Sequence, residues 1–433
     1  MRVTLFLSLF LMSTAIDSTA AEGPAVAEAN YDENKVGEFY LPDALTTLDG
    51  KGVGTTEDWK NVRRPEILEL FRREMYGRSP GRPMDLKFDL TATKTNALDG
   101  LATRRIYHVY VPGKNWKGMD VLLYVPNKAA KPVPAFTGLS FGGNHAVTTE
   151  PDVPLARGWV PNSGDVIKNN RPNEASRGKE ASRWAIKAIL ENGYALATAY
   201  YGDIEPDHRD GWRESVRSVF GDYSTHPDQS PDGWGAIGAW AWGLSRIMDL
   251  LETLPEIDSK KVAVMGHSRL GKTSLWAGAQ DQRFAIVISN DSGEGGAAIM
   301  RRNFGETVHR INTSFPHWFN GNFKSYNTNV NALPIDAHLL IALAAPRPVY
   351  IASAAEDLWA DPKGEFLSGM HADPVYRLYG KVGLKETNPP LIDHPIGEFI
   401  GYHNRTGKHD VTDYDWDQYI KFANRHFNRG AIN

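Results

Sequence analysis

The chain has 433 residues and a nearly balanced charge, with 48 Lys and Arg against 52 Asp and Glu and a formal net charge of −4. Such a balance provides no polybasic surface, so neither nucleic acid nor an anionic membrane is an expected partner. The sequence contains no cysteine, which excludes disulfides, thiolate metal sites and cysteine nucleophiles. A nucleophile therefore has to be another residue type.

The first residues have the pattern of a secretory signal. Met1 and Arg2 precede an apolar run from Val3 to about Ile16, and a stretch of small residues ends at Ala21. The apolar run is too short to cross a bilayer, and the small residues are typical of a cleavage site. We expect cleavage near Ala21 and an exported protein, either periplasmic or secreted. A buried N-terminal helix or a membrane anchor is the alternative.

The mature chain is expected to begin with an extended arm and a helix. Residues 22–58 are rich in Gly, Asp, Thr and Pro without periodicity, and we expect them to lie as an arm over the core. Apolar residues at helical spacing predict a helix from about Pro65 to Tyr76, which Gly77 ends. Three segments of β-forming residues between turns then predict antiparallel strands at 86–93, 103–112 and 119–126.

From residue 134 onward, short apolar strands alternate with helices. The strands are predicted at 134–139, 194–200, 261–265, 285–289 and 348–353, and the helices at 183–191, 235–254, 270–280 and about 414–427. This alternation is typical of an α/β fold with a mostly parallel, doubly wound sheet covered on both faces, a three-layer sandwich. The polar segments 146–180 and 295–345 are predicted insertions near the top of the sheet. We expect a single domain over residues 22–433.

The sharpest motif is a serine in a tight turn between a strand and a helix. The strand Val-Ala-Val-Met at 262–265 runs directly into Gly266 and Ser268, and the predicted helix follows. This is the context of an α/β-hydrolase nucleophile, in which small residues flank a strained serine. The second glycine, Gly271, comes three residues after the serine rather than two. A serine that merely caps the helix is the alternative interpretation.

Two cations follow the serine. The backbone N–H of Arg269 is placed as an oxyanion donor, and its guanidinium would lie within reach of the same oxyanion. Lys272 comes one helical turn after Ser268, so it can project toward the same pocket. Two cations beside a nucleophile suggest a substrate that carries its own negative charge.

Position along the chain selects the candidate base. In this fold the base histidine lies near the C-terminus, after the acid. Of the 13 histidines, His409 is the predicted base because it lies in a loop just ahead of the final helix. His403 is the alternative, and His267, which adjoins the nucleophile, is interpreted as structural.

Three acidic residues compete for the role of orienting this base. Glu356 and Asp357 follow the predicted strand at 348–353, and Asp291 follows the strand at 285–289. A carboxylate in either loop could orient the imidazole and stabilise its protonated form. We prefer Asp357 because the later loop is the usual source of the acid, and Asp291 is the second choice.

Four segments resemble, in the same order, the bacterial branch of the glucuronoyl esterase family. They are Arg-Pro-Glu-Ile-Leu at 64–68 with Met-Tyr-Gly-Arg at 75–78, Gly-His-Ser-Arg-Leu-Gly-Lys at 266–272, Arg-Arg-Asn-Phe-Gly-Glu-Thr at 301–307, and Glu-Asp-Leu-Trp-Ala-Asp-Pro-Lys-Gly-Glu-Phe at 356–366. The resemblance extends from about residue 30 to the C-terminus. His267 stands where fungal members have a cysteine, so the disulfide made there is absent.

The resemblance implies an α/β-hydrolase that cleaves the ester between 4-O-methyl-glucuronic acid of glucuronoxylan and lignin alcohols. It implies Ser268 as nucleophile, His409 as base and Arg269 as oxyanion donor. Because Asp291 stands where many members have Glu, its shorter side chain weakens the case for an acid there. The positions implied to contact the uronate ring and its hydroxyls are Lys272, Glu306, Trp359 and His208.

Together these expectations describe a serine esterase that acts by two-step acyl transfer. We expect no metal and no organic cofactor, a monomeric protein, and a carbohydrate ester as the one partner. An esterase for another ester, such as acetyl groups on xylan, is the alternative activity. A non-catalytic carbohydrate-binding protein on a hydrolase scaffold is the alternative from another class.

Overall fold

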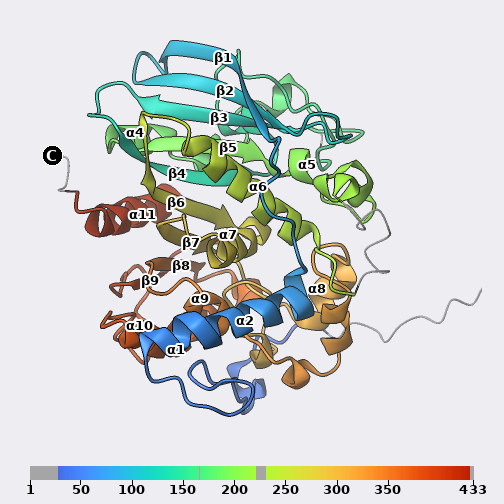
Figure 1. Ribbon diagram of the computed structural model, residues 1–433, viewed down its shortest axis with the longest axis vertical. Helices are drawn as coiled ribbons and strands as arrows, with labels where there is room; N and C mark the ends of the chain where they lie inside the picture. The colour runs from blue at the N-terminus through green and yellow to red at the C-terminus, as the bar shows by residue number, and fades with distance from the viewer. Residues whose placement is uncertain (1–27, 165, 221–230, 430–433) are drawn as a thin grey trace, which may run out of the picture.

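The computed structural model describes residues 28–164, 166–220 and 231–429, and a nine-stranded sheet runs through its centre (Figure 1). The strands lie in the order β1-β2-β3-β5-β4-β6-β7-β8-β9. Their bounds are β1 Lys87–Ala97, β2 Ala102–Tyr110, β3 Met119–Pro126, β4 Val133–Ser140, β5 Ala195–Tyr200, β6 Ile257–His267, β7 Ile286–Asn290, β8 Val349–Ala354 and β9 Ile400–Arg405.

Eleven α-helices are assigned in the described residues. Their bounds are α1 Thr56–Asp58, α2 Arg64–Phe71, α3 Asn144–Val147, α4 Ile186–Glu191, α5 Tyr201–Ile204, α6 Ala236–Leu251, α7 Arg269–Gln280, α8 Val308–Ser314, α9 Ala337–Ala342, α10 Pro362–Leu378 and α11 Asp413–His426. None of the described helices is both long enough and apolar enough to cross a membrane.

The sheet is parallel over most of its width. Strands β5, β4, β6, β7, β8 and β9 are joined by parallel pairings, whereas β1, β2 and β3 pair antiparallel at one edge. The predicted sheet, mostly parallel with antiparallel N-terminal strands at its edge, is confirmed. Because β6 to β9 all run the same way, the segments that follow them meet at one edge of the sheet.

Side chains of the central strands alternate between two helical layers. On β6, Val262 and Val264 belong to the core that includes α6 and α7, while Ala263 and Met265 belong to the core that includes α4 and α11. Successive residues of a strand point to opposite faces, so a strand that is apolar at every position is buried on both sides. The expected three-layer sandwich follows from this pattern and is confirmed (Figure 1).

Two elements near the C-terminus were not predicted. Helix α10 contains Gly364, Gly369 and Pro374, residues that disfavour a helix interior and hide its periodicity. Strand β9 reads Ile-Gly-Tyr-His-Asn-Arg, without the apolar run expected of a buried parallel strand. Its polar residues are accommodated because His403 and Arg405 both bond the buried carboxylate of Asp415 on α11.

The segment 295–345 is not simply an insertion above the sheet, which corrects the prediction. It contains α8 and α9, and α9 buries Leu339, Leu340 and Ile341 in the main core. Average polarity over fifty residues concealed this short apolar helix. The described part of segment 146–180, in contrast, holds the end of α3 and a 3-10 turn over Glu174–Ser176, and the rest of it is largely irregular, as predicted.

The N-terminal part differs from prediction in detail. The predicted helix 65–76 is divided into α2, which ends at Phe71, and a π-helical turn over Arg72–Tyr76. Gly77 ends it with φ 82°, and a Cβ there would lie 2.2 Å from Trp234 Cα. The left-handed backbone and the close approach both require glycine.

The described part of the predicted arm lies against the core. It is largely irregular from residue 28 to α1, yet Ala44 and Val53 are buried in the main core. Arg63 fixes the arm by donating hydrogen bonds to the carbonyls of Asp43 and Ala44. The predicted signal at residues 1–21 lies outside the described residues.

Candidate active site

A strained serine begins helix α7, where β6 ends. Ser268 has φ 57° and ψ −128°, a left-handed conformation that costs a non-glycine residue of order 1–3 kcal/mol. Its N–H donates a hydrogen bond of 2.8 Å to the carbonyl of Asn290 at the end of β7. The turn is therefore fixed to the neighbouring strand and presents the serine side chain at the carboxyl edge of the sheet, as the strand–turn–helix motif predicts.

Close packing explains the unusual glycine spacing. A Cβ on Gly266 would lie 1.8 Å from the carbonyl oxygen of Leu270, where the turn folds back on itself. A Cβ on Gly271 would lie 2.9 Å from Cβ of Ser292 in the loop after β7. The second glycine is thus required three residues after the serine because α7 packs there against the next loop.

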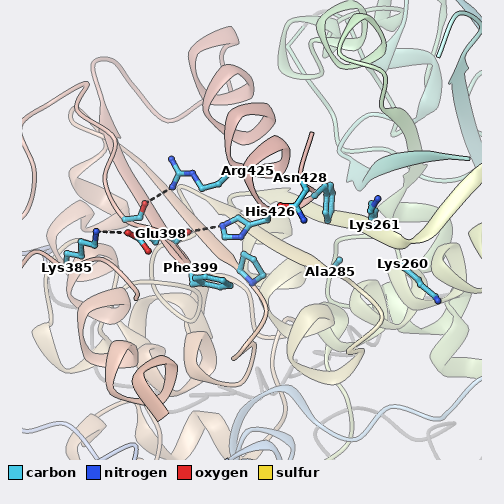
Figure 2. Close-up of a pocket in the computed structure, with 12 residues that line it drawn as sticks. Lys260, Lys261, Ala285, Lys385, Glu398, Phe399, Arg425, His426 and Asn428 are labelled. Carbon is cyan, nitrogen blue, oxygen red and sulfur yellow. Dashed lines mark hydrogen bonds and ion pairs between the residues drawn. The ribbon is translucent and has the colours of Figure 1, made fainter. Parts of the chain in front are cut away.

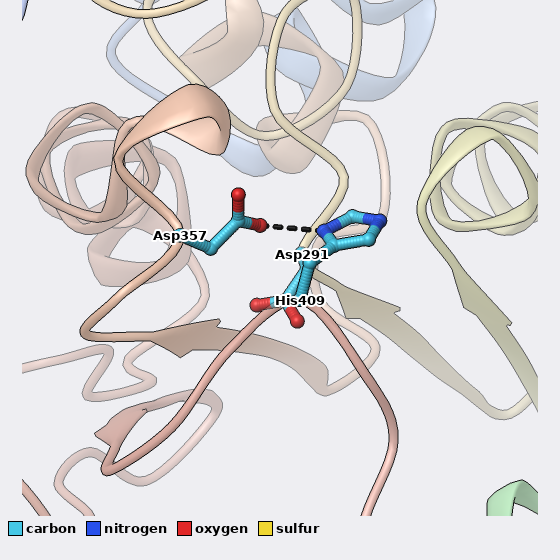
Figure 3. Close-up of side chains that lie close together, drawn as sticks. All are labelled: Asp291, Asp357 and His409. Atoms are coloured by element: carbon cyan, nitrogen blue, oxygen red, sulfur yellow. Dashed lines mark hydrogen bonds and ion pairs between the residues drawn. The ribbon is translucent and has the colours of Figure 1, made fainter.

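His409 and Asp357 form a pair at the same edge of the sheet (Figure 3). His409 Nδ1 and Asp357 Oδ2 are 2.5 Å apart in a hydrogen bond, and the imidazole is 39% exposed while the carboxylate is buried. The His409 ring also packs on His267, with 4.4 Å between ring centroids. Since His267 directly precedes Ser268, this contact places the imidazole close to the turn that carries the serine.

Burial separates the two neighbouring acids after β8. Glu356 is exposed, whereas the adjacent Asp357 is buried and points at His409. His403, the alternative base, lies inside β9, fully buried, with its ring nitrogens bonded to Asp415 and Tyr350. The structure thus brings His409 and Asp357 together and keeps Glu356 and His403 apart from this pair.

Asp291 is the third member of this cluster. One of its carboxylate oxygens lies within 4.8 Å of a carboxylate oxygen of Asp357 and of a ring nitrogen of His409. Figure 3 shows the three side chains close together. Its Oδ2 accepts a hydrogen bond from the Asp410 backbone and lies 3.6 Å from the Arg405 guanidinium. Burial, with nearby carboxylates, raises the pKa of Asp291 well above its ordinary value. A carboxyl that tends to hold a proton is a weaker partner for an imidazolium than an ionised one.

The same three side chains are the group that could hold a metal ion within the described residues. Their existing bonds favour proton chemistry instead. Asp357 already accepts a hydrogen bond from His409, and the cation beside Asp291 is Arg405. A divalent ion would have to displace both interactions, so the donor set fits an oriented imidazole better than a metal centre.

Arg269, the residue after the serine, is held by a buried acid and by aromatic rings. Its Nη1 forms an ion pair with Asp207, which follows α5. Its guanidinium carbon lies 4.7 Å from the ring centroid of Trp318 and 5.5 Å from that of Phe315. Cation–π contacts of this kind are worth of order 1 kcal/mol or more when shielded from water.

A buried lysine and a buried glutamate lie next to these groups. Burial lowers the pKa of Lys272, and the charge of Glu306 opposes that effect. Burial raises the pKa of Glu306, which the charges of Lys272, Arg269 and His409 oppose. Lys272, Glu306, Arg269 and His409 therefore share one electrostatic environment, which is where a polar ligand would meet both a donor and an acceptor.

The two remaining predicted contacts lie at the border of this environment. Trp359 is 36% exposed, and its backbone carbonyl accepts a hydrogen bond of 3.0 Å from the N–H of Glu306. An exposed indole tied to the loop of Glu306 is suited to stack on a sugar ring. His208 is partly exposed and packs on Trp159, with ring centroids 5.0 Å apart.

Sequence reasoning missed the residues that hold Arg269. Asp207, Trp318 and Phe315 come from segments more than 40 residues away from it along the chain. None of them stands in a motif with fixed spacing, so no local pattern could have identified them.

A large cavity lies away from these residues. It has a volume of about 870 Å³, and its lining lies at or near the starts of β6 to β9, whereas Ser268 follows the end of β6. Figure 2 shows the residues that line it. Its lining includes Lys260, Lys261, Lys385, Phe399 and Arg425. None of the predicted site residues contributes to it, so cavity size does not locate the candidate active site in this molecule.

Comparison with known proteins agrees with the geometry. Residues 217–380 match a family model described as fungal glucuronyl esterase. A carbohydrate esterase of an unknown prokaryotic organism is 49% identical, with 93% of each chain covered, and a 4-O-methyl-glucuronoyl methylesterase of Hypocrea jecorina is 30% identical over 75% of this chain and 59% of its own.

Solved structures agree in fold over nearly the whole chain. A glucuronoyl esterase from Solibacter usitatus superposes with a TM-score of 0.86 and 48% identity, covering 91% of this chain and 100% of its own. A glucuronoyl esterase from Teredinibacter turnerae has a TM-score of 0.76 and 30% identity, covering 89% of each chain. With this breadth of similarity, the chain belongs to the glucuronoyl esterase family, the α/β-hydrolases that act as carboxylic ester hydrolases on carbohydrate substrates.

Proposed function

We propose that this enzyme hydrolyses the ester between 4-O-methyl-glucuronic acid of glucuronoxylan and lignin alcohols through a serine acyl-enzyme. The observation that carries the mechanism is the His409–Asp357 pair beside the strained Ser268. A serine hydroxyl is a weak nucleophile unless a base removes its proton, and a base works best when a third group fixes its orientation. These three residues supply the nucleophile, the base and the orienting acid.

The first half of the reaction forms the acyl-enzyme. Ser268 Oγ attacks the ester carbonyl carbon while His409 takes the hydroxyl proton, and Asp357 stabilises the resulting imidazolium. The carbonyl oxygen becomes an oxyanion, which Arg269 stabilises. When the tetrahedral intermediate collapses, the bond to the alcohol breaks and His409 gives its proton to the departing alkoxide.

Water completes the cycle. His409 removes a proton from a water molecule, the hydroxide attacks the acyl carbon, and Ser268 leaves with the proton that His409 returns. The products are the free uronate and the alcohol. The uronate carries a new negative charge beside Arg269 and Lys272, so we expect product binding to weaken with increasing salt.

The buried charged pair supports a uronate as the acyl group. The hydroxyls of a glucuronate ring can both donate and accept hydrogen bonds. Lys272 can donate to such a hydroxyl, and Glu306 can accept from one. Trp359 offers an exposed aromatic face for the ring. An acetyl group has neither hydroxyls nor a ring, so it would make no use of these three side chains.

The decisive experiment compares two ester classes. We expect rapid hydrolysis of benzyl glucuronate and little release of acetate from acetylated xylan. The reverse preference would assign the site to acetyl esters. Fast labelling by a fluorophosphonate, lost in Ser268→Ala, is expected for a catalyst, and absence of labelling would instead indicate a carbohydrate-binding protein.

Two further proposals concern the protein rather than its chemistry. We propose that it is exported after cleavage near Ala21, which sequencing the N-terminus of the secreted or periplasmic form would check. We also propose that one domain over residues 22–433 acts as a monomer. Sedimentation at micromolar concentration would contradict this if the mass were twice that of the chain.

A further inference from the structure

Asp207 joins four groups around one buried carboxylate. It follows α5 and is 4% exposed on its side chain. Its Oδ2 accepts from Arg269 Nη1 and from the Tyr201 hydroxyl, the latter at 3.1 Å. Its Oδ1 accepts from His317 Nε2 at 2.8 Å and from Trp318 Nε1 at 2.7 Å. The carboxylate therefore bonds both the guanidinium and the indole on which that guanidinium stacks.

The carboxylate is charged in spite of its burial. Burial alone would raise the pKa of Asp207, but the hydrogen bond from His317 and the charge of Arg269 hold it well below its ordinary range. A buried ionised acid with two hydrogen bonds on each oxygen can be satisfied only in one arrangement of its neighbours. Arg269 is thus fixed before any substrate binds.

Part of the guanidinium remains without a partner. Among the described residues, none accepts a hydrogen bond from Arg269 Nε, although this atom is buried. A buried donor left unpaired costs of order 1–3 kcal/mol. The Arg269 side chain as a whole is 28% exposed, so it remains accessible to an oxyanion that exists only during the reaction, as preorganised transition-state stabilisation requires.

We propose that Asp207 is a positioning residue that holds the guanidinium of Arg269 ready for the tetrahedral oxyanion and aligns Trp318 beneath it. The proposal rests on the role assigned above to Arg269. A long arginine side chain loses up to about 2 kcal/mol of rotamer entropy when fixed. Asp207 fixes the Arg269 side chain in the free enzyme, so this side chain loses no further rotamer entropy as the oxyanion forms.

A double-mutant cycle tests whether Asp207 acts through Arg269. The variants are Asp207→Asn, Arg269→Ala and the double variant, assayed for kcat and KM on benzyl glucuronate. We expect D207N to lower kcat by about 10- to 100-fold with KM changed less than about threefold, because the oxyanion exists only after binding. In the R269A background, D207N should then lower kcat by less than about threefold.

The outcomes separate this inference from the proposed mechanism. If R269A is strongly impaired but D207N retains wild-type kcat, the positioning role is wrong and the mechanism stands. If the two effects multiply in the double variant, Asp207 supports the fold generally and not Arg269. If R269A retains full activity, the role of Arg269 is wrong and this inference fails with it.

Matched controls address loss of folding. Asp249 on α6 is equally buried and pairs with Arg246 at 2.6 Å and Arg283 at 2.7 Å, away from the site. We expect Asp249→Asn to lower the Tm without changing kcat. If D207N fails to fold, Tyr201→Phe removes a single donor from the same carboxylate oxygen. A kcat loss of about two- to fivefold in Y201F that disappears in the R269A background is then expected, and an unchanged kcat would contradict the proposal.

Discussion

The charged side chains at the two edges of the parallel sheet differ in their exposure to water. At the carboxyl edge, Asp357 and Asp207 are buried, and they hold His409 and Arg269 respectively. At the amino edge, the large cavity is lined by lysine and arginine side chains that remain in water (Figure 2). There Lys385 and its ion-pair partner Glu398 are 56% and 43% exposed.

This difference explains why the candidate active site lies at the carboxyl edge. Water and salt screen exposed charges, so an exposed ion pair contributes of order 1 kcal/mol or less. Charges withheld from water interact more strongly and keep a fixed geometry, which is what stabilising a transition state requires. The amino-edge cavity has a volume of about 870 Å³, but its charges are not preorganised. Changes at the carboxyl edge should therefore have large effects on activity, and matched changes at the amino edge should have small ones.

The largest effect is expected at the end of β6. Replacing Ser268 by Ala removes the attacking oxygen, so hydrolysis of benzyl glucuronate should fall by at least about 10⁴-fold. The matched control is Ser259→Ala, at the opposite end of the same strand, which should keep the wild-type rate. A Ser268→Ala variant with more than a tenth of the wild-type kcat would contradict both the mechanism and the comparison of the two edges.

The next effect separates the two acids near His409. Asp357→Asn keeps the shape of the side chain but no longer holds the imidazole as a proton acceptor, so kcat should fall by about 10²- to 10⁴-fold. Asp291→Asn should lower kcat by less than about tenfold, because its carboxyl contacts Asp410 and Arg405 rather than His409. Steady-state kinetics of the two variants and of their combination decide the matter. A larger loss in D291N than in D357N would reverse the assignment.

The sequence contained some of this site and lacked the rest, for physical reasons. Ser268 could be predicted because its strain, its flanking glycines and the helix after it are all local. The preference for Asp357 over Glu356 agrees with the structure only because the loop buries one and exposes the other, and adjacent acids look equivalent in sequence. Asp207 could not be predicted at all, since its four partners meet only in the folded chain.

The fold shows the same division between local and distant information. The parallel strands β4 to β8 were predicted because each contains a short apolar run, and helices α6, α7 and α11 because each has apolar residues at helical spacing. Strand β9 was missed because buried His403 and Arg405 read as a polar loop until Asp415 of α11 is placed beside them. Partners from distant parts of the chain allow a polar segment to form a buried strand, and the sequence of the segment alone does not identify these partners.

A third prediction concerns stability against pH. Burial raises the pKa of Glu365 from its ordinary value of 4.5 to about 8, and its oxygens contact the backbone N–H groups of Ser292 and Gly293. Between these two values the folded protein keeps a proton that the unfolded chain releases. The free energy of unfolding should therefore fall as the pH rises from about 4.5 to 8, by up to about 1.4 kcal/mol per pH unit.

Replacing Glu365 by Gln removes that titration, so the variant should lose less stability over the same pH range. The matched control is Glu398→Gln at the amino edge, whose pKa is lowered by its hydrogen bond with Lys385. That carboxylate is exposed, so no change in slope is expected across this range. Urea unfolding at several pH values measures both variants. Equal slopes in wild type and E365Q would show that Glu365 is ionised in the folded protein.

The smallest effect is expected from the amino-edge cations themselves. Lys260→Gln with Lys385→Gln removes two positive charges from the lining of the cavity. Benzyl glucuronate is uncharged and reacts at the other edge of the sheet, so kcat and KM should stay within about twofold of wild type.

Glucuronoxylan carries free uronates, so it is the substrate on which these cations could act. If they bind the polymer, its KM in the double variant would exceed that of the wild type at low salt. This difference would disappear above about 0.1 M, where the Debye length is about 10 Å. We expect no such rise, because exposed charges without a fixed geometry attract a polyanion only weakly. A rise for the polymer with an unchanged KM for the benzyl ester would give the amino edge a part in substrate binding and end the contrast between the two edges.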